Sequence, residues 1–123
     1  MISKDDSEDI IRKTISLMRI EDIVRSTSHS LHYALLVVKG RFPEGEEAIS
    51  KDAYFSVIYA VRCLKGRFLL GEEKIKTFKK YSSAVHFRTR YGEPYPSDYY
   101  NYYCTKMSEL LTDDELVLFK LEF

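Results

Sequence analysis

The stretch SKDAYFSVIYAVRCLKG, residues 50–66, is the most apolar long run of the chain, and its second half has a near copy upstream. Residues 33–49 (YALLVVKGRFPEGEEAI) and 59–75 (YAVRCLKGRFLLGEEKI) are identical at ten of seventeen positions, with a constant offset of 26. Each copy is typical of a helix that closes on Lys-Gly, a short loop, and an acidic start to the next helix. We expect Gly40 and Gly66 to adopt the left-handed conformation that ends such helices.

Helical spacing of apolar residues continues on both sides of this repeat, whereas no stretch shows strand alternation with hairpin turns. We predict helices near residues 7–25, 28–40, 50–66, 72–91, 98–111 and 112–121. The third helix could also begin at Pro43. The predicted fold is all-α and forms a single helical domain, residues 1–123. Its short connections favour an antiparallel up-and-down bundle, with a four-helix core and flanking N- and C-terminal helices.

The composition is that of an ordinary globular protein. Nineteen basic and nineteen acidic side chains cancel in 123 residues, so bulk charge indicates neither nucleic acid nor membrane as a partner. The two cysteines, Cys63 and Cys104, suggest reduced thiols rather than a disulfide framework. The charged residues 4–9 are unlike a signal peptide, and no apolar run is long enough to span a bilayer. We therefore expect a cytoplasmic protein with no membrane association.

The basic residues of the repeat have two interpretations. Lys39 with Arg41 and Lys65 with Arg67 could form two related anion sites. Alternatively, these cations stabilise helix C-termini, which carry partial negative charge, and we favour this structural role. It leaves the repeated arginine unexplained. Whether the repeat is a true duplication also stays open.

A basic segment follows the repeat. Residues 74–92 contain six lysines and arginines, no acidic residue, and interleaved aromatic side chains. Cations neutralise phosphates, and aromatic rings stack on bases, so the segment could face nucleotide or RNA. The alternative is a solvated basic face whose aromatic residues pack inward. The candidate ligand-binding residues are Arg88, Arg90, Tyr91, Tyr95, Lys79 and Lys80.

Six of the ten tyrosines lie within thirteen residues, at 91, 95, 99, 100, 102 and 103. Tyrosine combines a large contact area with a polar tip and is enriched at interfaces. Because so many adjacent rings cannot share one small core, we expect a homodimer whose interface uses part of this cluster.

Other kinds of site have no clear signal in the sequence. The three histidines have no metal-ligand spacing, and the glycines fit helix ends better than a phosphate-binding loop. No serine or cysteine has the context of a nucleophile. We predict no cofactor and no metal, and we identify no catalytic residue.

The central helix resembles that of a known family. Ala53-Tyr54-Phe55, followed by Tyr59-Ala60, Arg62 and Leu64, is similar to the long second helix of HEPN domains (higher eukaryote and prokaryote nucleotide-binding domains). The resemblance covers roughly residues 27–111. It implies a helical bundle, often dimeric, and many members are RNases or toxins encoded beside a small nucleotidyltransferase.

Catalytic members of that family carry Arg-x4–6-His near the dimer cleft. Here Tyr95 stands where the histidine would follow Arg90, and Arg25 with His32 has the spacing but lies on another helix. A tyrosine with the usual pKa near 10 is a poor general base at pH 7. The resemblance therefore implies nucleotide or RNA binding without efficient catalysis.

Two other functions remain open. One is a structural or regulatory protein-interaction module, either a homodimer or the partner of a nucleotidyltransferase in a toxin–antitoxin-like pair. The other is an active RNase that uses Arg90 with Tyr95 or His86.

Overall fold

A computed structural model describes residues 4–77 and 99–123, and this part of the chain is all-α without strands. The expected fold class is therefore confirmed. The α-helices are α1 (Lys4–Ser16), α2 (Ile20–Ile23), α3 (Thr27–Tyr33), α4 (Glu46–Ile49), α5 (Ala53–Ile58), α6 (Leu69–Lys76), α7 (Tyr99–Leu110) and α8 (Asp113–Glu122). A π-helical turn η1 (Ala34–Val38) extends α3, η3 (Tyr59–Leu64) extends α5, and a 3-10 turn η2 (Pro43–Gly45) precedes α4.

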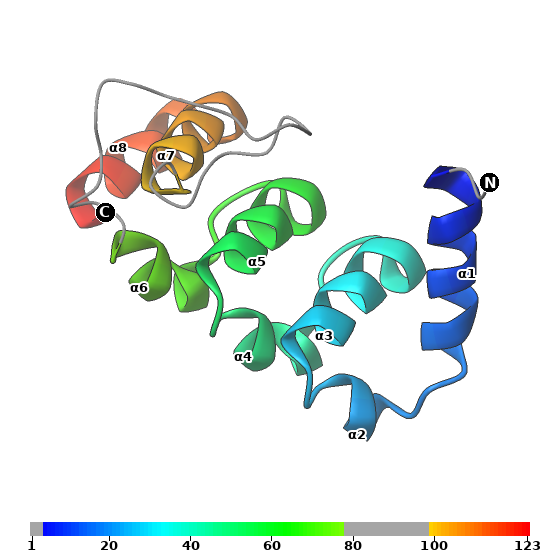
Figure 1. The fold of residues 1–123 in the computed structure, drawn as a ribbon. Coiled ribbons are helices and arrows are strands. Elements are labelled where there is room, and N and C mark those ends of the chain that lie inside the picture. The colour runs from blue at the N-terminus through cyan, green and yellow to red at the C-terminus, as the bar shows by residue number, and fades with distance from the viewer. Residues whose placement is uncertain (1–3, 78–98) are drawn as a thin grey trace.

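We group the helices in chain order into four successive pairs: α1 with α2, α3 with α4, α5 with α6, and α7 with α8. The odd-numbered helices contact one another in chain order, α2, α4 and α6 follow one another along the lower side of Figure 1, and α8 lies beside α7. The helices α3 and α5 lie side by side and run in the same direction (Figure 1). The antiparallel four-helix bundle is thus not confirmed. The arrangement is that of stacked helical repeats, in which each pair contacts mainly its neighbours.

In the structure, the 26-residue offset relates more of the chain than the sequence comparison indicated. The helix α2 begins and ends 26 residues before α4, and α3 begins 26 residues before α5. Ile23, Ile49 and Ile75 occupy equivalent positions and are fully buried. The hydroxyl of Ser30 donates to the Ile23 carbonyl (3.0 Å), as that of Ser56 does to the Ile49 carbonyl (3.2 Å). These bonds tie each long helix to the short helix before it.

Local sequence sets where the helices begin. The side chains of Ser26 and Asp52 accept hydrogen bonds from backbone N–H groups in the first turns of α3 and α5. Thr112 and Glu115 form the expected capping box before α8. The short helix α4 is separate from α5, so the third long helix begins at Ala53 rather than at Pro43 or Ser50.

The left-handed conformation predicted for Gly40 and Gly66 is wrong at both positions. The left-handed residues are Lys39 (φ 57°) and Lys65 (φ 53°), and each ends a π-helical turn. The N–H groups of Gly40 and Gly66 then reach back to the carbonyls of Ala34 and Ala60 (3.2 and 3.1 Å). Because of the π turn, the left-handed residue at the helix end is the lysine, one residue before the glycine.

Two predicted segments also differ from the structure. The expected helix 7–25 is divided into α1 and α2 by residues 17–19. The expected helix 72–91 is also wrong in its bounds, because α6 begins at Leu69 and ends at Lys76, with Thr77 in a turn; residues 78–98 lie outside the described part. No helix among the described residues is long and apolar enough to cross a membrane.

Candidate functional site

The repeated loops are the most elaborate polar structures in the described chain. The first loop is residues 39–45 and the second is residues 65–71. At the first loop, the Tyr59 hydroxyl donates to Glu46 Oε2 (2.6 Å) and accepts from the Phe42 N–H (2.8 Å). Because Tyr59 belongs to the third helical pair and Glu46 to the second, these bonds join two neighbouring pairs. We call this arrangement a tyrosine clamp.

The second loop has a matching clamp. The Tyr103 hydroxyl donates to Glu72 Oε2 (2.7 Å) and accepts from the Phe68 N–H (3.0 Å). Glu72 and Phe68 follow Glu46 and Phe42 by 26 residues, but Tyr103 follows Tyr59 by 44. A tyrosine from the fourth pair therefore holds the third, as a tyrosine from the third holds the second.

The junction between the first and second pairs has no such clamp. Tyr33 is the equivalent of Tyr59, but Ile20 stands where an acidic acceptor would be needed. The Tyr33 ring packs on Phe42, with ring centroids 4.7 Å apart, and its hydroxyl forms no hydrogen bond within residues 4–77 and 99–123.

The repeated arginine, which helix-end electrostatics left unexplained, pairs with the clamp carboxylate. Arg41 Nε lies 3.2 Å from Glu46 Oε2. Arg67 grips Glu72 with two bonds of 2.9 and 2.8 Å. The structural interpretation of these residues therefore accounts for the arginine as well. Each carboxylate serves a tyrosine and an arginine at once.

The two arginines differ in their surroundings. Arg67 also donates to Glu122 of α8 (2.9 Å) and lies over the Phe119 ring, 5.2 Å from its centroid. Its side chain is 14% exposed, whereas that of Arg41 is 69% exposed. Among the described residues, Arg41 forms a hydrogen bond only through Nε. Its two terminal nitrogens are thus available.

Burial shapes the proton equilibria of the clamps. Burial, with the hydrogen bond to the neighbouring carboxylate, raises the pKa of Tyr59 and Tyr103 far above the usual value of tyrosine. Hydrogen bonds to Glu72 raise the pKa of Arg67 further above its already high value. These groups stay protonated at physiological pH and act as hydrogen-bond donors.

Glycine is required inside each loop for space. A Cβ atom on Gly45 would lie 2.5 Å from the Phe42 ring, and one on Gly71 would lie 2.5 Å from the Ser56 hydroxyl. Both positions let the loop phenylalanine fold against the preceding long helix. By contrast, Gly40 and Gly66 have ample room for a side chain.

An open groove lies between the two loops. Its volume is about 680 Å³, and its walls are Arg41, Glu46, Cys63, Leu64 and residues 66–70. Leu69 and Leu70, which are 63% and 55% exposed, replace the Pro43-Glu44 of the first loop. Burial raises the pKa of the Cys63 thiol to about 11, so it is a weak nucleophile at neutral pH. The groove therefore offers an arginine and an aliphatic wall.

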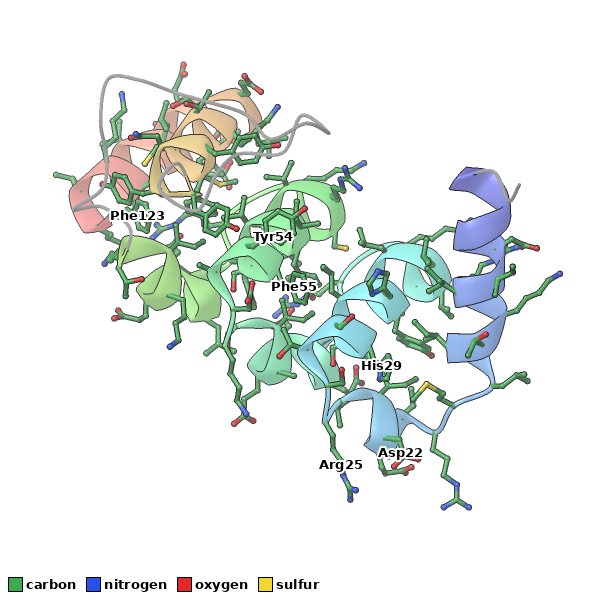
Figure 2. All side chains as sticks on the ribbon, viewed as in Figure 1. Asp22, Arg25, His29, Tyr54, Phe55 and Phe123 are labelled. Atoms are coloured by element: carbon green, nitrogen blue, oxygen red, sulfur yellow. The ribbon has the colours of Figure 1, made fainter. Side chains whose placement is uncertain are left out.

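A second hollow surrounds α2 and is lined by Met18, Arg19, Ile20, Glu21, Asp22 and Arg25. Its charges are mixed and exposed, and Arg25 points away from the helical array (Figure 2). His32, the partner of Arg25 in the Arg-x6-His spacing, bonds through Nδ1 to the Ser28 carbonyl on its own helix (2.8 Å).

All six predicted ligand-binding residues, Arg88, Arg90, Tyr91, Tyr95, Lys79 and Lys80, lie outside the described residues, as does His86. Of the basic segment, Lys74 and Lys76 are described. Lys76 bonds to the Glu122 carbonyl (3.3 Å) and lies over the Phe123 ring, so it contributes to the contact between α6 and α8.

The described part of the tyrosine cluster packs within the chain. Tyr103 is fully buried, and Tyr100 stacks on Phe123 with ring centroids 5.0 Å apart. Tyr99 lies against Tyr54 (5.6 Å), and Tyr102 carries the Lys106 ammonium over its ring (5.6 Å). These four rings therefore do not require a partner subunit, and the homodimer stays a prediction.

Residues that carry the HEPN resemblance also have local structural roles. Tyr59 and Ala60 are buried and repeat Tyr33 and Ala34. Tyr54 and Phe55 pack on each other (5.8 Å) at the start of α5 (Figure 2). Packing and the clamp account for these residues without a ligand.

Sequence reasoning missed the clamp acids and Tyr103. Glu46 and Glu72 carried a usable signal, since each follows the repeated arginine by five residues and the buried glycine by one. Tyr103 carried none, because its spacing departs from the 26-residue offset. Within the described residues, no group of three or more His, Cys, Asp or Glu side chains could hold a metal ion.

Comparisons of the sequence with protein-family models and with curated proteins, and a comparison with solved structures, found no match. The HEPN resemblance therefore rests on the residues quoted for it.

Proposed function

We propose that this chain is a protein-interaction module built from stacked helical pairs. The observation that carries the proposal is the tyrosine clamp, which recurs between the second and third pairs and between the third and fourth. Stacked helical repeats generate extended surfaces on which protein segments dock. The clamps fix each pair against the next, so the surface is preorganised and loses little entropy on binding.

The groove and the flanking surface support the same function. Small-molecule sites are usually enclosed, whereas this groove is open and offers one available arginine and two exposed leucines. Such a surface suits a peptide better than a small molecule. On α8, Val117, Leu118 and Leu121 are exposed as well. Exposed apolar groups of this kind are typical of surfaces that meet other proteins.

Nucleotide or RNA binding through Arg88 and Arg90 is the competing proposal, with a homodimer or a nucleotidyltransferase partner as its setting. It rests on the basic composition of residues 74–92 and on the HEPN resemblance. Arginine is the residue of interest here because its planar fork can grip a phosphate with two hydrogen bonds.

Titration of labelled single-stranded RNA separates the two functions. The wild type and the double variant Arg88→Ala/Arg90→Ala are compared at two salt concentrations, one near about 150 mM, because binding to a polyanion weakens steeply with salt. The interaction module predicts no saturable binding, or binding equal in both proteins. Salt-sensitive binding that the double variant loses would overturn it in favour of RNA.

Selection from a phage-displayed peptide library supplies the positive test. We expect enrichment of a consensus sequence that binds the folded protein and is competed by free peptide. Failure to enrich any sequence over several rounds would contradict the proposed function.

A further inference from the structure

The two loop arginines are equivalent in sequence but unequal in their partners. Arg67 receives a second carboxylate, Glu122, and an aromatic ring, Phe119, from α8. Arg41 receives neither. Both bind the clamp carboxylate of their own loop. The second loop thus shows which groups pack on this arginine when a neighbouring segment covers it: a carboxylate and an aromatic ring.

The surroundings of Arg41 match that chemistry. Its side chain lines the groove of about 680 Å³, and Leu64, Leu69 and Leu70 line the same groove. Two of these leucines are more than half exposed. A carboxylate would find the available guanidinium nitrogens, and a large apolar side chain would cover the leucines.

We propose that the groove between the two loops binds an acidic, apolar segment of a partner protein. A carboxylate of that segment pairs with Arg41, as Glu122 pairs with Arg67, and an aromatic or aliphatic side chain packs on Leu69 and Leu70. This proposal deepens the proposed function and rests on it.

The groove suits a peptide carboxylate better than a phosphate backbone. Glu46 already occupies one side of Arg41, so one available cation faces the ligand rather than a cluster. A polyanion would leave the exposed leucines uncovered, and burying apolar area is the main source of affinity at such a site. The neighbouring Glu46 is no obstacle to a second acid, because Arg67 holds Glu72 and Glu122 together.

The probe is a fluorescein-labelled synthetic peptide with the sequence of residues 113–123, which carries the acidic and aromatic groups that meet Arg67. Its binding to the full chain is followed by fluorescence anisotropy. We expect Arg41→Gln, and separately the pair Leu69→Ser/Leu70→Ser, to weaken binding at least about tenfold, a factor that corresponds to about 1.4 kcal/mol.

Two controls isolate the groove. Arg62→Gln removes another exposed arginine, which does not line the groove, and should change the affinity less than about twofold, well below the tenfold that 1.4 kcal/mol represents. A peptide with amides in place of its four acids should bind no better to the wild type than the parent peptide binds to Arg41→Gln. Circular dichroism melts confirm that each variant is folded, which is expected because Arg41 forms only an exposed ion pair.

The proposal is overturned by absence of binding at about 1 mM peptide, which corresponds to about −4 kcal/mol. It is equally overturned if binding is indifferent to Arg41→Gln, or if labelled RNA, rather than peptide, depends on Arg41. A consensus from the peptide library that lacks acidic residues would reject this partner class while leaving the interaction module intact. Loss of the interaction module itself would show instead in the RNA titration with the Arg88/Arg90 variant.

Discussion

The first and second loops have the same clamp but different environments. In both, a tyrosine hydroxyl bridges a glutamate and the N–H of the loop phenylalanine. At the second loop α8 covers the arginine, and Glu72 is 7% exposed. At the first loop the arginine extends into an open groove. The repeated sequence thus determines the geometry of the junction. We expect the contribution of each junction to the free energy of unfolding to depend on what covers it.

Replacing the clamp glutamate should give the largest difference in stability loss between the two loops. Glu72→Gln leaves Arg67 in a mostly buried site with one exposed acid partner, and we expect a loss of about 3 kcal/mol. Glu46→Gln removes a pair whose arginine is 69% exposed and can turn to solvent, so it should cost about 1 kcal/mol. Urea denaturation of both variants measures the difference. Equal losses would show that α8 does not strengthen the second junction.

Removing the clamp hydroxyls should affect the two loops alike. Tyr59→Phe and Tyr103→Phe each leave a buried backbone N–H without its acceptor, so each should cost about 2 kcal/mol. Tyr33→Phe is the matched control, because the Tyr33 hydroxyl forms no hydrogen bond within residues 4–77 and 99–123 and its ring still packs on Phe42. If only one of the two clamp variants lowers the unfolding midpoint, the two clamps do not contribute equally to stability.

Adding a methyl group at the buried loop glycine tests how closely α6 approaches α5 within the third pair. Gly71→Ala drives a Cβ atom into Ser56 and the Phe68 ring, and overpacking of this kind costs at least about 1 kcal/mol. Gly66→Ala meets only ordinary contact with Leu111 at 3.9 Å and should change stability by less than about 0.5 kcal/mol. A larger loss for Gly66→Ala would restore the original expectation of a left-handed glycine there.

The smallest effect concerns the left-handed lysines. Lys39→Gly and Lys65→Gly relieve the steric cost of positive φ and should raise stability by about 0.5–1 kcal/mol each. Lys74→Gly, within α6, should instead lower it by about 1 kcal/mol, because glycine is a poor helix former. Thermal melts of the three variants show whether each substitution raises or lowers stability. Destabilisation by Lys65→Gly would contradict the left-handed assignment.

Local signals explain how much of this fold could be predicted. The Lys-Gly pairs, the capping box at Thr112 and the helical spacing identified an all-α chain and several of its helix ends. The left-handed residue was misplaced because a π turn cannot be distinguished from an α turn by residue type. The stacked arrangement was missed because it depends on long-range bonds. Tyr103 and Glu72, for example, are 31 residues apart.

The candidate site was less predictable than the fold. Arg41 and Arg67 were noticed through their repetition, but their different partners arise from Glu122, which lies 55 residues beyond Arg67. Leu69 and Leu70 interrupt the repeat, and their exposure became evident only in three dimensions. The residues nominated for RNA binding lie in the part of the chain that the structure does not describe, so their role still depends on the proposed titration.

The missing clamp between the first two pairs has a consequence for how the chain loses its structure. In a linear array, coupling acts between nearest neighbours, so unravelling starts at the junction with the weakest coupling. Tyr33 has no acidic partner at Ile20, and this junction depends on apolar packing among residues such as Ile15, Ile23 and Leu31 and on the Ser30 bond. The amides of α1 should therefore exchange with solvent deuterium well before those of α5, and the N-terminal pair could detach while the remaining array stays intact.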